Sequence, residues 1–465
     1  MKTPSMTRRD FLSTSAKAGA TLVGGSALAS AVAACGGSPS TAATESKTIA
    51  VEIDEGQNAL PFQWFSAGMK AKYGVSTKIE GLPFVGQYAQ IVAAMVSHSS
   101  AYDVLVFPPQ MLGDFVAKGF LRKLTDYGPA SAFDLCDILP AYRTQMTRNG
   151  DLYAAMYDGD TLMLTYRRDI FERAGITAPP STWEEYLAVA KELHHPPTQY
   201  GNAYLGQRGF CYAWFFNIYA ALGGSWFDSN MEPAFVNDTG VRALEMLVEL
   251  GKYAPPQELN IGYPQLNEAY LNGSTAMVIQ WDDLPLKTEN PAVSKVVGKS
   301  GFAPCPQRTY MPYSRVMGIS AYSASPHNSW KVIQYMNSAA VSVRDVYDPN
   351  CGEDPFRYSA LDPSLVLTHT GQPSMSSGQA AAYVGAIKAC LSAGYPELSI
   401  PGAPRYLDQL DLYVNKAIAG SATPAQALQS AAAAWNGITQ SQGRSSQERA
   451  YQAWVQSQRA VGLAI

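Results

Sequence analysis

Acidic and aromatic residues stand together at two points where a strand is expected to end. Asp160 lies just beyond the strand-like run 152–155, and Trp281 and Asp282 directly follow the short strand-like run 275–280. Carboxylates accept hydrogen bonds from hydroxyl groups, and an aromatic ring packs against the apolar C–H face of a sugar. These residues are therefore candidate contacts to a hydroxylated ligand. The alternatives are that Asp160 stabilises a turn and that Asp282 caps a helix.

Seven further residues are candidates for the same site. Some lie next to expected strands, where open α/β sheets bind ligands, and the tryptophans could stack on a sugar ring. For each of them a structural role is an equally good explanation, and the two arginines would also suit an anionic ligand. These candidates are Gln110, Tyr157, Trp214, Trp226, Tyr313, Arg315 and Arg357.

Known catalytic patterns do not occur in the chain. There is no GxSxG nucleophile elbow, and Gly298-Lys299-Ser300 lacks the preceding glycine of a phosphate-binding loop. Glu184 and Glu185 are adjacent in an expected helix, so their carboxylates do not face each other, and with Thr182 they form a capping pattern. No CxxC or HExxH spacing indicates a metal. We therefore predict no catalytic residue, no metal site, no cofactor and no enzymatic activity.

The elements that position these residues alternate between strand and helix. Strand-like runs at 48–53, 75–79 and 102–107 are separated by helical spacings that include Phe62 and Met69, and later Ile91 and Met95. This βαβαβ pattern predicts an open α/β sheet. Ligands bind beyond the carboxyl ends of such strands, which places residues 54–58 and 108–111 at the rim of a site.

Composition narrows the class of ligand. Of the 465 residues only 15% are charged, and the net charge is −4. The chain lacks the basic surplus that binding to a phosphate backbone requires, so no nucleic-acid partner is expected. With 27 Tyr and 8 Trp, the composition suits a neutral hydroxylated ligand, although aromatic residues also build cores.

The first 47 residues read as an export signal and a tether. Arg8-Arg9 matches the twin-arginine pattern, a weakly apolar stretch reaches Ala34, and Val32-Ala33-Ala34-Cys35 resembles a bacterial lipobox. This pattern predicts a signal peptide over 1–34, a lipid on Cys35 and a flexible Gly/Ser/Thr tether to residue 47. The protein is expected outside the cytoplasm, in the periplasm or on the outer face of the cell membrane, held by this anchor.

Five cysteines remain in the mature chain, an odd number, so at least one is not paired within the chain. A Cys305–Cys351 disulfide is the favoured pairing in an oxidising compartment, and buried free thiols are an equally good alternative.

Three longer stretches resemble the family 1 extracellular solute-binding proteins of bacterial ABC importers, the group that includes maltose-binding protein. The resemblance covers essentially the whole mature chain, and the tail from Trp435 to Gln447 is most similar to the sugar and polyol members. The stretches are Asn149-Gly150-Asp151-Leu152-Tyr153-Ala154 continuing to Ser181-Thr182-Trp183-Glu184-Glu185, then Leu271-Asn272-Gly273-Ser274-Thr275-Ala276-Met277, and Gly318-Ile319-Ser320-Ala321.

The resemblance implies an α/β, two-lobed periplasmic-binding-protein fold of type II, with a hinge and an interlobe ligand cleft. The N-terminal lobe would comprise residues 48–157 with 302–347, and the C-terminal lobe 158–301 with 348–465. The chain would cross between lobes near 155–160, 299–304 and 348–355.

The implied function is that of a substrate-binding lipoprotein, which binds a sugar or sugar alcohol and delivers it to the permease subunits of an ABC importer. Asp160 would correspond to a sugar-contacting acid of the maltose binder, and Trp281 to a stacking aromatic. The alternatives are a binder of a charged small solute, such as an amino acid, polyamine or glycerol phosphate ester, and a secreted carbohydrate-active enzyme that uses two carboxylates.

Overall fold

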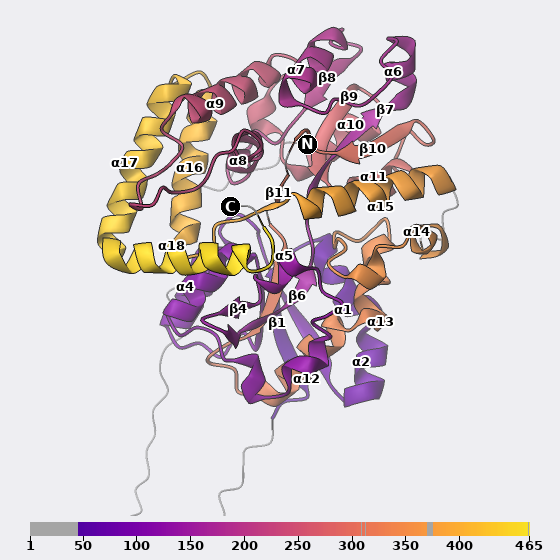
Figure 1. Ribbon diagram of the computed structural model, residues 1–465. Helices are drawn as coiled ribbons and strands as arrows, with labels where there is room; N and C mark the ends of the chain where they lie inside the picture. The colour runs from indigo at the N-terminus through magenta and orange to yellow at the C-terminus, as the bar shows by residue number, and fades with distance from the viewer. Residues whose placement is uncertain (1–44, 308, 312, 370–374, 464) are drawn as a thin grey trace, which may run out of the picture. The chain divides into compact units, whose positions relative to one another are not determined.

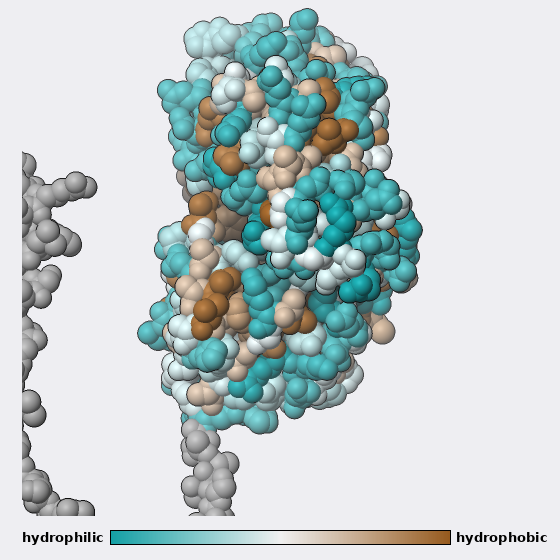
Figure 2. Space-filling view, turned by 90° about the vertical axis from the view of Figure 1, so that its left-hand side faces the viewer, coloured by the Kyte–Doolittle hydropathy of each residue, from teal (hydrophilic) through white to brown (hydrophobic). Residues whose placement is uncertain are grey.

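A computed structural model describes residues 45–307, 309–311, 313–369, 375–463 and 465. The predicted signal peptide 1–34, the lipidated Cys35 and most of the tether lie outside the described residues. Within this part of the chain, no helix is long and apolar enough to cross a membrane. The face drawn in Figure 2 is mostly hydrophilic, with hydrophobic residues gathered in small patches.

A first sheet of five strands has the order β2-β1-β3-β12-β6. The expected βαβαβ unit is confirmed, because β1 pairs in parallel with both β2 and β3. Gly74, with φ 67°, ends the helix between the first two strands in the left-handed conformation that glycine adopts without strain. The strands are β1 Thr48–Asp54, β2 Ser76–Leu82, β3 Val104–Phe107, β6 Ala154–Asp158 and β12 Arg315–Ile319.

A second sheet of four strands has the order β10-β7-β9-β8. Its inner strand β9 is buried along its whole length, which explains the apolar run 276–279 in the sequence. The capping box expected at Thr182 and Glu185 is present at the start of helix α7 (Trp183–Glu192) and fixes where this helix begins. The strands are β7 Leu162–Arg167, β8 Tyr200–Ala203, β9 Thr275–Trp281 and β10 Ser300–Pro304.

The chain passes between the two sheets at places that only partly match the expectation. The first passage lies between β6 and β7, as expected. The prediction that the chain returns to the first lobe near 299–304 is wrong. Residues Ser300 to Pro304 form β10, which pairs antiparallel with β7 and so belongs to the second sheet. The chain reaches the first sheet only at Arg315, where β12 begins.

The first passage packs directly on the segment around Asp354. The backbone N–H of Gly159 donates to the carbonyl of Asp354 at 3.1 Å, and the N–H of Asp354 donates to Oδ1 of Asp158 at 2.7 Å. A Cβ on Gly159 would lie 2.7 Å from the carbonyl oxygen of Pro355. Only glycine therefore allows these two segments to approach so closely.

Helices surround both sheets, and four long ones form the C-terminal part of the chain (Figure 1). Thr423 caps α17, and Pro424 occupies its first turn, as the sequence predicts. The longer helices are α7 Trp183–Glu192, α8 Cys211–Ala221, α9 Asp238–Gly251, α12 Pro326–Asn337, α15 Ser377–Ser392, α16 Ala403–Ile418, α17 Pro424–Gln442 and α18 Arg444–Arg459. The shorter elements are α1 Leu60–Trp64, α2 Ser66–Tyr73, α3 Gln87–Val96, α4 Leu112–Ala117, α5 Pro140–Arg143, α6 Arg168–Arg173, α10 Tyr263–Leu271, α11 Leu284–Thr288, α13 Ala339–Ser342, α14 Pro363–His369, β4 Thr147–Arg148, β5 Asp151–Leu152, β11 Tyr310–Met311 and β13 Tyr395–Pro396.

The predicted Cys305–Cys351 disulfide is wrong. Both residues are buried free thiols, as are Cys211 and Cys390, while Cys136 is exposed. The Cys305 thiol donates to the carbonyl of Leu162 at 3.3 Å, whereas the Cys351 thiol contacts the carboxyl group of Glu353. The two thiols therefore sit in separate environments, which spacing along the sequence could not reveal.

Candidate ligand-binding site

A cavity of about 270 Å³ opens where the two sheets face each other. Its walls come from the ends of β1 and β9, from the turn after β2 and from the segments that link the two sheets. The residues 54–58 expected at the rim are therefore in place. The lining residues are Asp54, Glu55, Gln57, Asn58, Phe84, Asp160, Phe210, Tyr263, Pro264, Trp281, Asp283, Tyr313, Arg315 and Gly352.

One wall of the cavity is aromatic. Phe84, from the turn after β2, stacks on Phe210, which precedes α8, with ring centroids 5.2 Å apart. Tyr313 packs edge-on against both rings. The ring centroid of Trp281, at the end of β9, lies 5.9 Å from that of Tyr313 and 5.7 Å from that of Tyr263. Residues from both sheets thus build one apolar surface on which the face of a ligand can pack.

The polar side of the cavity centres on Arg315. Its guanidinium group donates to both oxygens of Asp54, at 2.7 and 2.9 Å, and to Oδ2 of Asp158 at 2.7 Å. It also lies 3.6 Å from Oδ2 of Asp160. Burial alone would lower the pKa of Arg315, but the attraction of Asp54 and Asp158 outweighs it, and the pKa lies above its usual value. The arginine is therefore a permanent cation at the cavity wall.

Two of the three carboxyl groups near Arg315, those of Asp158 and Asp160, have raised pKa values. Burial raises the pKa of Asp158 to about 6, although the attraction of Arg315 opposes this rise. Burial, and then the repulsion of Asp158, raise the pKa of Asp160 well above its usual value. Asp160 can therefore donate or accept a hydrogen bond at the cavity wall, depending on whether it holds a proton.

A second polar cluster, formed by Gln57, Tyr263 and Asp283, also borders the cavity. The Gln57 amide donates to the hydroxyl of Tyr263 at 2.8 Å, and that hydroxyl contacts the carboxylate of Asp283. Lys287 pairs with the same carboxylate and also donates to the carbonyl of Cys351 at 3.2 Å. This chain of contacts joins the turn after β1 to the end of β9.

Of the ten residues predicted to contact ligand, four line the cavity together: Asp160, Trp281, Tyr313 and Arg315. Three others lie directly behind its wall. Asp282 accepts the backbone N–H of Thr161 at 2.9 Å, Trp214 packs its ring edge-on against Trp281 at 5.4 Å, and the Tyr157 hydroxyl donates to the carbonyl of Asn58 at 2.6 Å. These three side chains hold the wall in place.

The remaining three candidates lie away from the cavity. Trp226 is fully buried and stacks on Phe216, with centroids 3.4 Å apart. Arg357 is also buried, and its guanidinium group donates to the Asn337 side chain at 2.9 Å. Gln110 is buried in the short turn Pro109–Met111 and does not line the cavity. Residue type alone did not separate a core position from a cavity position.

Six lining residues were not singled out from the sequence: Phe84, Phe210, Tyr263, Pro264, Asp283 and Gly352. Two of them carried a usable signal, because Phe84 lies two residues beyond the end of β2 and Asp283 continues the Trp281-Asp282 pair. Phe210 and Tyr263 carried none, since their place in the wall depends on the packing of distant segments.

The chain belongs to the bacterial extracellular solute-binding proteins, whose family model matches residues 44–342. Among characterised or named relatives, a probable amino-acid ABC transporter periplasmic-binding protein of Sinorhizobium fredii is 24% identical over 66% of this chain and 72% of its own length. The mannitol-binding protein of Pseudomonas aeruginosa is 26% identical over 47% of this chain, and the match spans 51% of that protein.

Solved structures share the fold. A solute-binding protein of Agrobacterium radiobacter in complex with ribitol has a TM-score of 0.74 at 23% identity and covers 85% of this chain and 99% of its own. A solute-binding protein of Agrobacterium vitis with bound D-mannitol has a TM-score of 0.72 at 21% identity, again covering 85% and 99%. The expected two-domain α/β fold of the maltose-binding-protein type is confirmed.

Proposed function

We propose that this protein captures a small polyhydroxylated solute, a sugar alcohol or a monosaccharide, in the cavity between the two sheets and delivers it to the permease of an ABC importer. The observation that carries the proposal is the pairing of two surfaces in one cavity. Trp281, Phe210 and Phe84 offer an apolar wall, and Arg315 with Asp54 and Asp160 offers fixed donors and acceptors. A carbon chain with a hydroxyl on each carbon needs both.

Cavity size supports a small solute over an oligosaccharide. The volume of about 270 Å³ lies at the lower limit of small-molecule pockets, which run from about 300 to 1,000 Å³. One relative is named for mannitol, and two of the similar structures hold ribitol and D-mannitol, which are solutes of this small size.

The proposed mechanism is closure of two lobes on the solute. The first lobe would hold the sheet that contains β1, and the second would hold the sheet that contains β9 together with β10. The solute would bind to Arg315 and Asp54 of the first lobe and to Trp281 of the second, so that closure completes the site. The protein would release its solute unchanged, and so act as a binder and not as an enzyme.

Export and anchoring complete the proposal. The twin-arginine motif at Arg8-Arg9 and the lipobox ending at Cys35 support export followed by lipid attachment. Two single substitutions test the lipid anchor. Cys35→Ser should release the protein from the membrane fraction. The control, Cys136→Ser, removes an exposed cysteine of the folded part and should leave the protein attached.

A second candidate is a cationic solute such as a polyamine. Four acidic side chains line the cavity, Asp54, Glu55, Asp160 and Asp283, against one lining cation, Arg315. Such an excess of carboxylates favours ammonium groups over anions. The same count argues against glycerol phosphate esters as ligands.

A thermal-shift screen tests these two candidates against each other. The purified protein is melted in the presence of sugar alcohols, monosaccharides, disaccharides, amino acids and polyamines. We expect one polyol or monosaccharide to raise the Tm, because ligand at a hundredfold excess over its Kd adds about 2.7 kcal/mol to the free energy of unfolding. A shift with polyamines and none with any carbohydrate would overturn the proposal. Ligand recovered chemically altered would overturn the assignment as a binder.

A further inference from the structure

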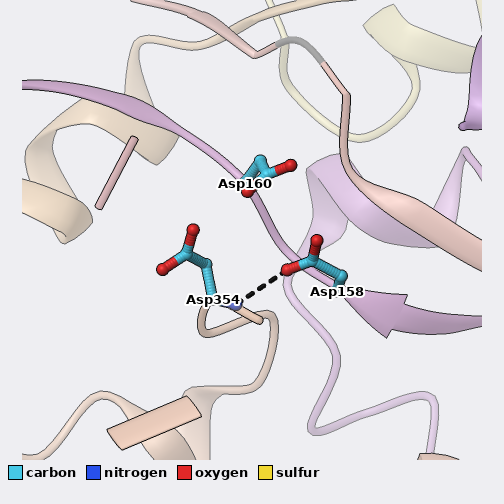
Figure 3. A group of neighbouring side chains, drawn as sticks. All are labelled: Asp158, Asp160 and Asp354. Atoms are coloured by element: carbon cyan, nitrogen blue, oxygen red, sulfur yellow. Dashed lines mark hydrogen bonds between the residues drawn. The ribbon is translucent and has the colours of Figure 1, made fainter. Parts of the chain in front are cut away.

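Three buried carboxyl groups converge behind the cavity. Asp158 and Asp160 flank the glycine between β6 and β7, and Asp354 comes from the segment that packs on it (Figure 3). One carboxylate oxygen from each residue lies within 4.8 Å of the other two, and all three residues are at most 4% exposed. Figure 3 shows the three groups facing one another across a common space.

The Asp354 carboxyl group is an independent sign that something binds there. It is fully buried, and no N–H or hydroxyl group of the described residues donates to either of its oxygens, whose polar neighbours are the carboxyl groups of Asp160 and Asp282. Oδ2 of the neighbouring Asp282 is likewise buried and without a partner in the described structure. A buried carboxylate without a partner is costly, so a counter-charge is expected beside these oxygens.

Neither of the two nearby cations among the described residues pairs with Asp354. Arg315 donates to Asp54 and to Asp158 and lies 3.6 Å from Asp160, so it offsets part of the charge of the cluster without forming an ion pair with Asp354. Lys287 pairs with Asp283 and with the carbonyl of Cys351. The described residues therefore place no side-chain cation on Asp354.

We propose that a calcium ion binds between Asp158, Asp160 and Asp354, with Asp282 as a further oxygen donor. A donor set made only of oxygen is the one that hard divalent cations select. Calcium–oxygen distances of about 2.3–2.6 Å place ligands on opposite sides of the ion about 4.6–5.2 Å apart, which matches the spread of these oxygens. The four residues lie in three separate parts of the sequence, so no local motif announces the site.

The proposed calcium site lies where two segments that link the sheets contact each other, which suits a structural role for the ion. Asp158 and Asp160 belong to the first passage between the sheets, and Asp354 belongs to the segment bonded to that passage through Gly159. The ion would tie the two segments together and fix their angle. Only Asp160 of the three ligands also lines the solute cavity, so calcium binding and solute binding can be measured separately.

Calorimetric titration of calcium into the chelator-treated protein tests the proposal. The titration is done at neutral pH without any sugar, and melting curves are recorded with and without calcium. We expect saturable binding of one ion per chain and a higher Tm with calcium. Asp354→Asn should weaken calcium binding by at least about tenfold, whereas Asp126→Asn, at an exposed position, should leave it unchanged.

Each other outcome has a definite meaning. The absence of binding heat and of any Tm change up to about 10 mM calcium, tenfold above the Kd of the weakest natural calcium sites, would overturn the proposal. The three carboxyl groups would then be held together by shared protons and not by a metal ion. Tighter binding of magnesium than of calcium would overturn the choice of ion. Unchanged binding in a folded Asp354→Asn variant would overturn the location, and if that variant does not fold, Asp282→Asn replaces it. Since no sugar is present, failure here leaves the solute proposal standing.

Discussion

Arg315 and Asp54 form a two-pronged ion pair in which Nε and Nη2 donate to Oδ1 and Oδ2, at 2.7 and 2.9 Å. Their strands, β12 and β1, are not neighbours, because β3 lies between them in the sheet. The third guanidinium nitrogen bonds Asp158 at the end of β6. One side chain therefore joins the ends of three strands and holds the polar wall of the cavity in a fixed shape.

Arg315→Lys should lower the free energy of unfolding by about 1–3 kcal/mol, because an ammonium group cannot reproduce the planar pair of hydrogen bonds to Asp54. Urea denaturation measures the change. Arg173→Lys is the matched control, since Arg173 pairs with Asp169 at an exposed position, and its effect should stay below about 0.5 kcal/mol. Equal effects of the two substitutions would show that the Arg315 pair has no special role.

Gly159→Ala should destabilise the protein by at least about 1–3 kcal/mol, because the new methyl group would lie 2.7 Å from the carbonyl oxygen of Pro355. Gly385→Ala provides the comparison within α15, where a Cβ meets nothing within 4 Å. There the substitution should be stabilising by up to about 1 kcal/mol, as in any open helix interior. Thermal melting of both variants gives the answer, and a stable Gly159→Ala protein would contradict the close packing of the two segments.

Glu52 should make stability fall as pH rises. Its side chain is fully buried in β1, and burial raises its pKa from 4.5 to about 8. Between these values the folded protein holds a proton that the unfolded chain releases. The stabilisation that this bound proton gives the folded protein is therefore complete below pH 4.5 and is lost as pH rises through 8. Over this range the free energy of unfolding falls by at most about 1.4 kcal/mol per pH unit.

Glu52→Gln removes this proton, so the stability of the variant relative to the natural protein should improve steadily from pH 5 to pH 8. Denaturant unfolding at several pH values measures the difference, which cancels the contributions of other buried acids. Glu192→Gln, at an exposed helix position, should show no such trend. A difference that stays constant with pH would mean that Glu52 is ionised in the folded state.

Local patterns were enough to predict the βαβαβ unit, the cap at Thr182 and the rim at residues 54–58, because each depends on neighbours in the chain. The assignment of β10 to the second sheet depends on pairing with β7, which residue periodicity does not encode. The same limit applies to the tryptophans. Trp281 and Trp226 both follow plausible ligand-site patterns, yet one borders the cavity and the other stacks on Phe216 in the core.

The acidic cluster at Asp158 shows this limit most clearly. Asp160 was recognised as a site residue from its place after a strand, but Asp354 comes from a distant segment and carries no recognisable motif. Only the contact between the two segments, through Gly159, brings these carboxyl groups together. Residue identity indicated the chemistry, whereas the folded chain determines which groups share a site.

Calorimetric titration of the polyol or monosaccharide found by the screen into four proteins tests the central claim most directly: the natural protein, Trp281→Ala, Asp160→Asn and Trp64→Ala. Trp64 is 41% exposed and lies outside the cavity, so it controls for loss of a tryptophan. We predict one solute bound per chain, affinity reduced at least about tenfold by Trp281→Ala and by Asp160→Asn, and no change with Trp64→Ala. Affinity that survives both cavity substitutions in folded protein would place the solute elsewhere and contradict the account.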